Sequence, residues 1–452
     1  MSRVKDMTSG NPLHLMVGFA IPLILGNLGQ QLYMIVDTII VGQGVGVKAL
    51  ASLGATDWTY WLFLWMVQAI TQGCSIRVTQ DFGSKDYSQL RKSIAMSVRI
   101  CFVAGVGVTM LGLLLGKPLL VLLQTPENLM NGALTYFYLM IGGIIISVCY
   151  NMSAAILRSF GDGKTPLVAM GIAALVNIAL DLLFVMVFHW GIAGAAIATL
   201  IAQALSFLYC FHVLRKLDFL QFEKSDWAND TKRVKELVKL GTPLMFQNMV
   251  IAGGGMVLQS VINKYGIIFV AGFTATNKLY GLLETSAISF GYATTTYTAQ
   301  NWGAKKIQRI VDGLKTATKL SLIISVVVGL SLIGVGRQLL TLFIASESYA
   351  NQVLDVAYKY LFVMSIFLPA LYLLYTYRCT LQGLGNTVAP MISGFIEFFM
   401  RVIAALIFPL AIGSTGIFYA EVTAWVGAMI YLMISCLASI KQIQEQVIEN
   451  AS

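Results

Sequence analysis

Two polar residues in the middle of an apolar run are the strongest candidates for chemistry in this chain. The run covers residues 166–188, and its polar members are Asn177 and Asp181. Because they are four positions apart, a helix places both side chains on one face. A carboxylate at membrane depth is costly to bury, so it should face protein, water or an ion. This predicts a functional site on this helix. The alternative is a carboxylate that only bonds to a neighbouring helix.

The composition indicates that membrane helices must hold this site. The chain has 452 residues, of which 57% are hydrophobic and 11% are charged, whereas an ordinary soluble domain is about 25% charged. The six cysteines lie in apolar runs without C-x-x-C spacing, so we predict small core residues and neither disulfides nor a metal centre. No small-residue cleavage site follows the first apolar run, so we predict that it is a retained span.

Hydropathy predicts an all-α polytopic membrane protein with twelve transmembrane helices. Each span needs about 20 mainly apolar residues. Residues 215–239 are the longest hydrophilic stretch and are predicted to be a cytoplasmic linker. The linker separates an amino-terminal lobe of six spans, residues 1–214, from a carboxy-terminal lobe of six spans, residues 240–452. The predicted spans are 13–42, 50–79, 93–116, 133–157, 165–188 and 191–214, then 240–263, 268–298, 310–336, 355–382, 388–410 and 415–440.

The basic residues gather on one side of these spans. They lie mainly at the termini, in the linker and in the even-numbered connections. By the positive-inside rule, both termini face the cytoplasm, which predicts a multi-pass protein of the cytoplasmic membrane. Topology therefore explains the net charge of +9. No basic run is interleaved with aromatic residues, so nucleic acid is not predicted as a partner.

The two halves of the chain repeat each other at a nearly constant offset. The segment 80–85, QDFGSK, corresponds to 300–305, QNWGAK, and Pro22 in the first span corresponds to Pro243 in the seventh. An even number of spans returns the chain to the side it left, so both copies share one orientation. We therefore predict two pseudo-symmetric lobes around a central cleft, as in a transporter that alternates between outward-open and inward-open states.

Several segments together resemble the multidrug and toxic compound extrusion (MATE) family, over nearly the whole chain. They are 30–42 (QQLYMIVDTIIVG), the repeated 80–85 and 300–305 loops, 161–166 (GDGKTP) and the Asn-x-x-x-Asp motif at 177–181. The resemblance implies a cation-coupled antiporter that exports small organic compounds, often cationic or aromatic. In prokaryotic members with an amino-lobe coupling site, an Asp, an Asn/Asp pair and a hydroxyl handle the cation. These features map onto Asp37, Asn177, Asp181 and Thr199.

The four mapped residues are suited to either Na⁺ or H⁺ as the coupling ion. Two carboxylates, an amide oxygen and a hydroxyl are hard oxygen ligands, so all four would be metal ligands if Na⁺ is the ion. No other cofactor is predicted, and we expect the chain to act as a monomer in membrane lipid. If Asp37 and Asp181 lie close, their ionised forms repel. A bound cation or proton would relieve this repulsion and favour one packing of the lobe.

Five further polar residues are candidates to line the cleft or contact cargo: Tyr33, Asn151, Gln203, Lys278 and Glu284. Tyr33 precedes Asp37 by one turn and shares its helix face. Asn151 and Gln203 could instead form hydrogen bonds between helices. Lys278 and Glu284 could instead form a buried pair that reaches across helices.

The second lobe does not repeat the coupling site. Arg401 and Ala405 occupy the positions that correspond to the Asn/Asp pair of the fifth span. The spacing of Glu397 and Arg401 predicts a structural ion pair on one helix face. Arg378 and Glu421 lie near predicted span ends, where a charged side chain can extend to the membrane interface.

Other classes of function lack their motifs. The chain has no H-E-x-x-H, G-x-S-x-G or P-loop sequence, so we predict neither an enzyme nor an ATP-driven pump. The remaining alternative is a lipid-linked precursor flippase or polysaccharide exporter of the related superfamily. Such a protein should have a strongly basic cavity for its pyrophosphate, and intramembrane cations are few here, chiefly Lys278 and Arg401.

Overall fold

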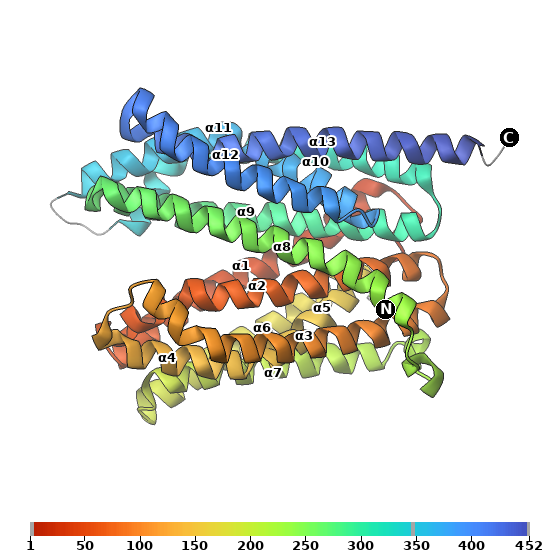
Figure 1. The fold of residues 1–452 in the computed structure, drawn as a ribbon, viewed down its shortest axis with the longest axis horizontal. Coiled ribbons are helices and arrows are strands. Elements are labelled where there is room, and N and C mark those ends of the chain that lie inside the picture. Colours follow the sequence, from red (N-terminus) through yellow and green to blue (C-terminus); the bar gives the residue numbers. More distant parts are fainter. Residues whose placement is uncertain (1–3, 345–348, 450–452) are drawn as a thin grey trace. The chain divides into compact units, whose positions relative to one another are not determined.

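The computed structural model describes residues 4–344 and 349–449, and the regular elements within these ranges are all helices (Figure 1). The α-helices are α1 (Pro12–Gly44), α2 (Val47–Gly83), α3 (Tyr87–Leu122), α4 (Glu127–Gly142), α5 (Ile144–Ser159), α6 (Lys164–Asp181), α7 (Gly191–Arg215), α8 (Thr231–Ile262), α9 (Ile267–Gly303), α10 (Ile307–Leu340), α11 (Ala350–Gly383), α12 (Val388–Ile412) and α13 (Phe418–Glu449). The shorter turns are the π-helix η1 (Leu182–Val187) and the 3-10 helices η2 (Asp218–Leu220), η3 (Lys224–Trp227), η4 (Asn263–Tyr265), η5 (Thr341–Phe343) and η6 (Gly413–Ile417).

These helices make twelve long passages, six before the linker and six after it. The passage of α4 and α5 is bent, and η1 continues the passage of α6. By length and composition, eight of the described helical segments could cross a membrane, or nine if the bent pair is one span; α12 and α13 count together as one of the eight. The long helices α2 and α9 are more polar and are not among them. The predicted all-α architecture is confirmed.

The fourth predicted span, 133–157, is not one straight helix. It consists of the two helices α4 and α5, and the bend between them at Gly143 is 47°. A Cβ atom at Gly143 would lie 2.3 Å from the side chain of Leu200 on α7. A larger residue at this position would have to displace the Leu200 side chain. Hydropathy measures apolar content, so it cannot detect such a break.

The chain divides into two compact units. The described residues of 1–7 and 19–245 form unit 1, and those of 8–18 and 246–452 form unit 2. The long helices α1 and α8 therefore each begin in one unit and end in the other. The linker and the first turns of α8 belong to unit 1.

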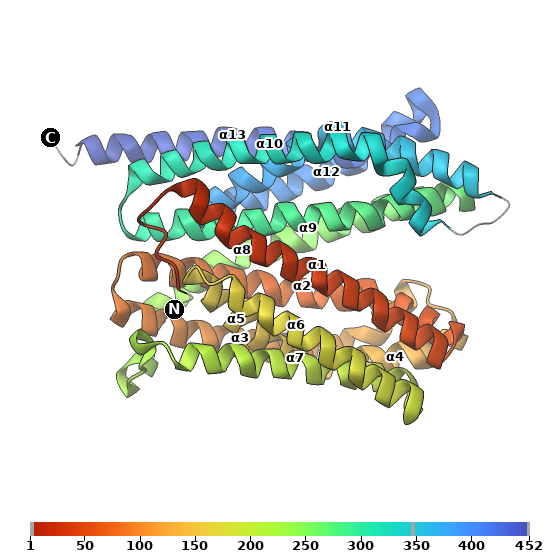
Figure 2. The same ribbon diagram turned by 180° about the vertical axis from the view of Figure 1, so that it is seen from behind.

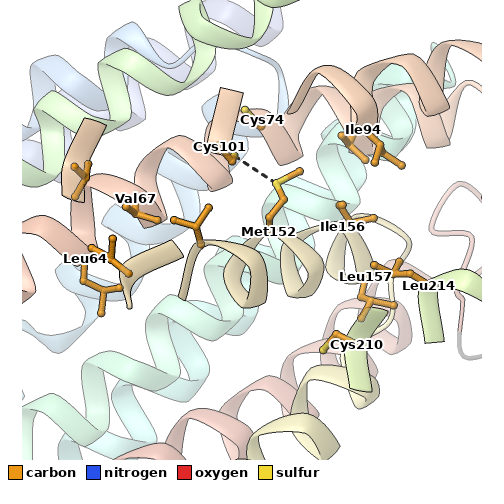
Figure 3. Close-up of a cluster of buried hydrophobic side chains, with 14 of the residues drawn as sticks. Leu64, Val67, Cys74, Ile94, Cys101, Met152, Ile156, Leu157, Cys210 and Leu214 are labelled. Carbon is orange, nitrogen blue, oxygen red and sulfur yellow. Dashed lines mark hydrogen bonds between the residues drawn. The ribbon is translucent and has the colours of Figure 1, made fainter. Parts of the chain in front are cut away.

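The core of unit 1 lies among α2, α3, α5 and α7. Figure 3 shows part of it, with Cys74 of α2, Cys101 of α3 and Met152 of α5 near one another. The thiol of Cys101 lies 3.7 Å from the sulfur of Met152. Cys210 of α7 is also fully buried in this cluster. These thiols act as small apolar side chains that let the four helices approach closely.

The core of unit 2 is rich in stacked aromatic rings. The ring of Phe273 on α9 stacks on Tyr360 of α11 with centroids 4.2 Å apart. Tyr360 in turn stacks on Phe418 of α13 at 5.3 Å, and Trp425 of α13 is among the largest fully buried side chains. Offset ring pairs stabilise a core beyond the area that they bury. This stack joins α9, α11 and α13 within the N-terminal third of each helix.

Ion pairs hold the linker against the C-terminal end of α2 and the N-terminal end of α3. Arg233, at the start of α8, donates to Asp81 of α2 at 2.8 Å and to Ser93 of α3 at 2.7 Å. Asp226 in η3 accepts from Arg91 of α3 at 2.8 Å. Burial opposes ionisation of Asp226, but hydrogen bonds from the Glu223 amide and from Arg91 outweigh it and lower its pKa. The linker is thus a docked part of unit 1.

Replacing Gly73 with alanine is expected to destabilise unit 1 by about 1–3 kcal/mol, because overpacked helices must move apart. A Cβ atom there would lie 2.3 Å from the Cα atom of Gly241 on α8. Gly54, on the same helix, is exposed and has no atom within 4 Å of the corresponding position. Gly54→Ala is therefore the matched control and should be neutral or slightly stabilising. Thermal unfolding of the purified protein measures both, and equal midpoints would contradict this close α2–α8 contact.

Candidate functional site

The predicted coupling residues come from three helices of unit 1. Asp37 lies on α1, Asn177 and Asp181 lie on the last turns of α6, and Thr199 lies on α7. Helices α1 and α6 run beside each other in unit 1 (Figure 2), and a Cβ atom at Gly26 of α1 would lie 3.5 Å from the Cα atom of Leu167 on α6. This close approach brings the polar face of α6 toward α1.

A π-helix begins directly after Asp181. Helix α6 ends at Asp181, and the wider turn η1 follows it. Val185 and Met186 of η1 pack against Gly44 of α1, where a Cβ atom would lie 2.5 Å from the Met186 sulfur. Such π-turns occur often at functional sites. Here the wide turn directs the end of α6 against α1 and helps to position Asp181.

Four oxygen atoms of the site are buried without a hydrogen-bond partner among the described residues. They are Oδ1 of Asp37, Oδ1 of Asn177 and both carboxylate oxygens of Asp181. Asn177 is 1% exposed and Asp181 0% exposed, whereas Asp37 is half-buried. A buried acceptor with no partner costs free energy, so each of these oxygens can accept a bond from a bound ion or proton.

The two carboxyl groups are near neighbours. Their charges interact, and the groups are close enough for one to bond to the other when it carries a proton. The side-chain amide of Asn177 donates to the Thr199 hydroxyl at 3.4 Å, and its carbonyl oxygen is buried without a hydrogen-bond partner among the described residues. A buried apolar cluster of α1, α2, η1 and α7 includes contacts from Val36 and Ile178, which adjoin Asp37 and Asn177 in the sequence. These donors suit a hard monovalent cation or a shared proton.

The other predicted residues of unit 1 have different surroundings. Tyr33 is half-buried on α1, and its hydroxyl is close enough to interact with both Asp37 and Asp181. Asn151 donates to the Ser147 carbonyl of its own helix at 2.8 Å. Gln203 accepts a hydrogen bond from the Ser147 hydroxyl, which joins α7 to α5. Tyr33 is therefore part of the site's surroundings, whereas Asn151 and Gln203 make contacts that support the helices.

Two tyrosines near the site were not predicted. Tyr60 of α2 is buried beside the Ser147–Gln203 pair. Tyr136 of α4 lies near Asp37 and Tyr60. Tyrosines are common at membrane interfaces and between helices, so no pattern in the sequence distinguishes these two.

The charged residues of unit 2 form different pairs from the one that their spacing predicts. The predicted pair of Glu397 and Arg401 is wrong. Glu397 bonds to Arg378 of α11, and Arg401 donates to Glu421 of α13 from two nitrogens at 3.1 and 2.9 Å. The predicted extension of Arg378 and Glu421 to the interface is also wrong, because both side chains turn inward to these partners.

The remaining two charged candidates of unit 2 do not pair with each other. Glu284 is half-buried on α9 and accepts a hydrogen bond from the Tyr375 hydroxyl at 3.0 Å. Lys278 is exposed on the same helix. Among the residues that the structure describes, no ion pair links the two. A separation of six positions places them on different faces of α9.

Comparison with known proteins identifies the family. A family model described as MatE matches residues 22–183 and 243–407. The chain is 32% identical over 311 residues to the probable multidrug resistance protein YpnP of Bacillus subtilis, covering 68% of this chain and 69% of the relative. It is 23% identical to the probable multidrug resistance protein NorM of Thermotoga maritima, over 84% of this chain and 82% of that one.

A solved structure has the same fold. A crystal structure of MATE in the bent conformation superposes with a TM-score of 0.90 at 22% identity, covering 99% of each chain. The family match covers most of both units, and the relative at 32% identity is named as a probable multidrug resistance protein. The chain therefore belongs to the MatE family of membrane transporters and is not an enzyme.

Proposed function

We propose that the protein exports small organic compounds in exchange for an inward flow of Na⁺ or H⁺. The main support is a set of four buried oxygens on α1 and α6 that have no hydrogen-bond partner among the described residues. A buried carboxylate is stable only when it is paired, protonated or bound to a cation. The site therefore changes its charge whenever the ion binds or leaves.

The ion would act by changing the repulsion between Asp37 and Asp181. When both carboxylates are ionised and the ion is absent, their charges favour separation of α1 from α6. When a proton or Na⁺ neutralises the site, closer packing becomes favourable. Helix α1 contains Pro22, whose missing hydrogen bond lowers the cost of bending. Exchange requires only that cargo and ion favour different states of the protein.

The proposed cargo is organic and often cationic or aromatic. The relatives named as multidrug resistance proteins support this class. The rival cargo, a lipid-linked pyrophosphate, would need unpaired positive charge in the membrane. In the described part of unit 2, however, Arg378 and Arg401 are each neutralised by a glutamate. Of the two chief intramembrane cations, this leaves Lys278, and a single lysine is not a strongly basic cavity. We further propose that the protein works as a monomer in the cytoplasmic membrane with both termini in the cytoplasm.

Transport into everted vesicles tests the proposal. Vesicles that contain the protein should accumulate ethidium when a sodium or a pH gradient is imposed, and the effective gradient identifies the ion. Vesicles without the protein are the control. The proposal fails if the protein moves ethidium at the same rate with and without both gradients. Movement of a lipid-linked sugar instead of ethidium would support the rival cargo.

A further inference from the structure

We propose that Glu284, together with Tyr280 and Tyr375, binds the positive charge of a monocationic aromatic cargo in unit 2. This inference rests on the proposed function, because it assumes an organic cation as cargo. It adds a cargo site that is separate from the ion site of Asp37 and Asp181.

Glu284 lies near the middle of a long helix and is not fully buried. Helix α9 runs from Ile267 to Gly303, so the carboxylate is far from both helix ends. The side chain is half-buried. An ionised group at membrane depth does not face lipid at tolerable cost, so its exposed part should face water or cargo.

The hydroxyl groups of two tyrosines lie beside the Glu284 carboxylate. The Tyr375 hydroxyl of α11 donates to its Oε1 atom at 3.0 Å. Tyr280, one turn earlier on α9, is a second hydroxyl neighbour. The Tyr280 ring stacks on Trp425 of α13 with centroids 5.4 Å apart and planes 19° apart. This stacking holds the Tyr280 ring in place, so its hydroxyl stays near the carboxylate.

The charge of Glu284 is not neutralised by a partner of its own. Arg401 and Glu421 both lie near enough to influence it, but they form an ion pair with each other. Arg401 also donates to the Ile251 carbonyl at 3.2 Å. Among the described residues, no basic side chain lies within ion-pairing distance of Glu284. Hydroxyl donors alone leave a carboxylate in this setting incompletely compensated.

A carboxylate between aromatic rings matches the chemistry of an organic monocation. The negative charge attracts the cation, and the ring faces that Arg378 and Trp425 do not cover contribute cation–π attraction and apolar contact. A small hydrated metal ion would gain little from the rings. The site should therefore prefer a large, weakly hydrated cation to an anion of the same shape.

The test compares two ions of equal size and opposite charge. Isothermal titration calorimetry of the purified full-length protein measures binding of tetraphenylphosphonium and of tetraphenylborate. Loss of a charged contact corresponds to about a tenfold weaker affinity, and we expect this for tetraphenylphosphonium with Glu284→Gln. Tetraphenylborate binding should be unchanged or tighter. Glu284→Asp, which keeps the charge, should retain most of the affinity.

Two controls separate a charge effect from misfolding. Glu445→Gln removes one exposed negative charge on α13 and should leave both affinities unchanged. Thermal unfolding confirms that each variant is folded. Unchanged tetraphenylphosphonium binding by folded Glu284→Gln would overturn the proposal, as would an equal loss for both ions. If Glu284→Gln binds tetraphenylphosphonium normally but its transport no longer depends on the ion gradient, Glu284 belongs to the ion site. This outcome also overturns the cargo-site proposal.

The experiments can reject the proposed ion coupling and the proposed cargo site separately. Asp181→Asn should bind tetraphenylphosphonium like the wild type while losing its response to the gradient. If wild-type transport ignores both gradients but Glu284→Gln still loses the cation selectively, the coupling proposal fails and the cargo site stands. The reverse pattern, with coupled transport and no effect of Glu284→Gln on binding, rejects only the cargo site.

Discussion

Asparagine at position 181 is expected to abolish the dependence of export on the ion gradient. Asparagine matches aspartate in size, so packing around the fully buried side chain is kept. It carries no charge, so neither a proton nor Na⁺ changes the repulsion between α6 and α1. Coupling between two ligands is typically worth about 5- to 150-fold. We expect a loss near the upper end, because both carboxylate oxygens of Asp181 lack other partners among the described residues.

Proteoliposomes provide the measurement. The initial rate of ethidium transport is recorded with and without an imposed gradient for the wild type and for Asp181→Asn. Asp218→Asn is the matched control, because it makes the same chemical change on an exposed side chain of the linker and should behave like the wild type. A gradient response in Asp181→Asn equal to that of the wild type would remove Asp181 from the coupling site.

Replacing Thr199 distinguishes Na⁺ from H⁺ as the coupling ion in the same assay. Its hydroxyl accepts from the Asn177 amide at 3.4 Å and would be an oxygen ligand of Na⁺. A proton shared by the two carboxyl groups does not need it. Thr199→Val should therefore weaken a sodium-driven response and leave a proton-driven response nearly intact.

Much of the fold could be predicted from the sequence, because the membrane imposes a simple rule. Backbone groups in lipid must bond within a helix, so long apolar runs predict helices and the polar linker predicts the midpoint. The bend at Gly143 could not be predicted in this way. It depends on how closely Leu200 of α7 approaches, which is a property of packing between distant segments.

The candidate site was predictable where a residue was anomalous by itself. A carboxylate in an apolar run draws attention to Asp181, and spacing adds Asn177. The wide turn after Asp181 and the nearby hydroxyl of Tyr136 were not predictable, since they follow from local hydrogen bonding and tertiary contact. The proximity of Asp37 to Asp181 could not be predicted from the residue types either, because it depends on how α1 packs on α6.

Removing either member of the buried Arg378–Glu397 pair is expected to destabilise unit 2 by about 3–5 kcal/mol, because the other charge stays buried without its partner. Both side chains are only about 5% exposed. Arg378 also donates to the Ser393 hydroxyl at 3.1 Å and lies over the ring of Tyr375 at 5.6 Å. Arg378→Met and Glu397→Leu should each lower the thermal unfolding midpoint strongly. The double variant should recover much of the loss, because well-packed apolar residues often replace a buried pair at little cost.

A double-mutant cycle distinguishes this pairing from the one that helical spacing favours. Residues in contact show a large interaction free energy, and residues without contact are nearly additive. The cycle of Arg378 with Glu397 should therefore give a large interaction. The cycle of Arg401 with Glu397 should give a small one, because Arg401 is held by Glu421. A larger value for the second cycle would place Glu397 with its neighbour on α12. Helical spacing favours only the second pairing, whereas Glu397 bonds to Arg378 of α11, which Ser393 and Tyr375 also contact.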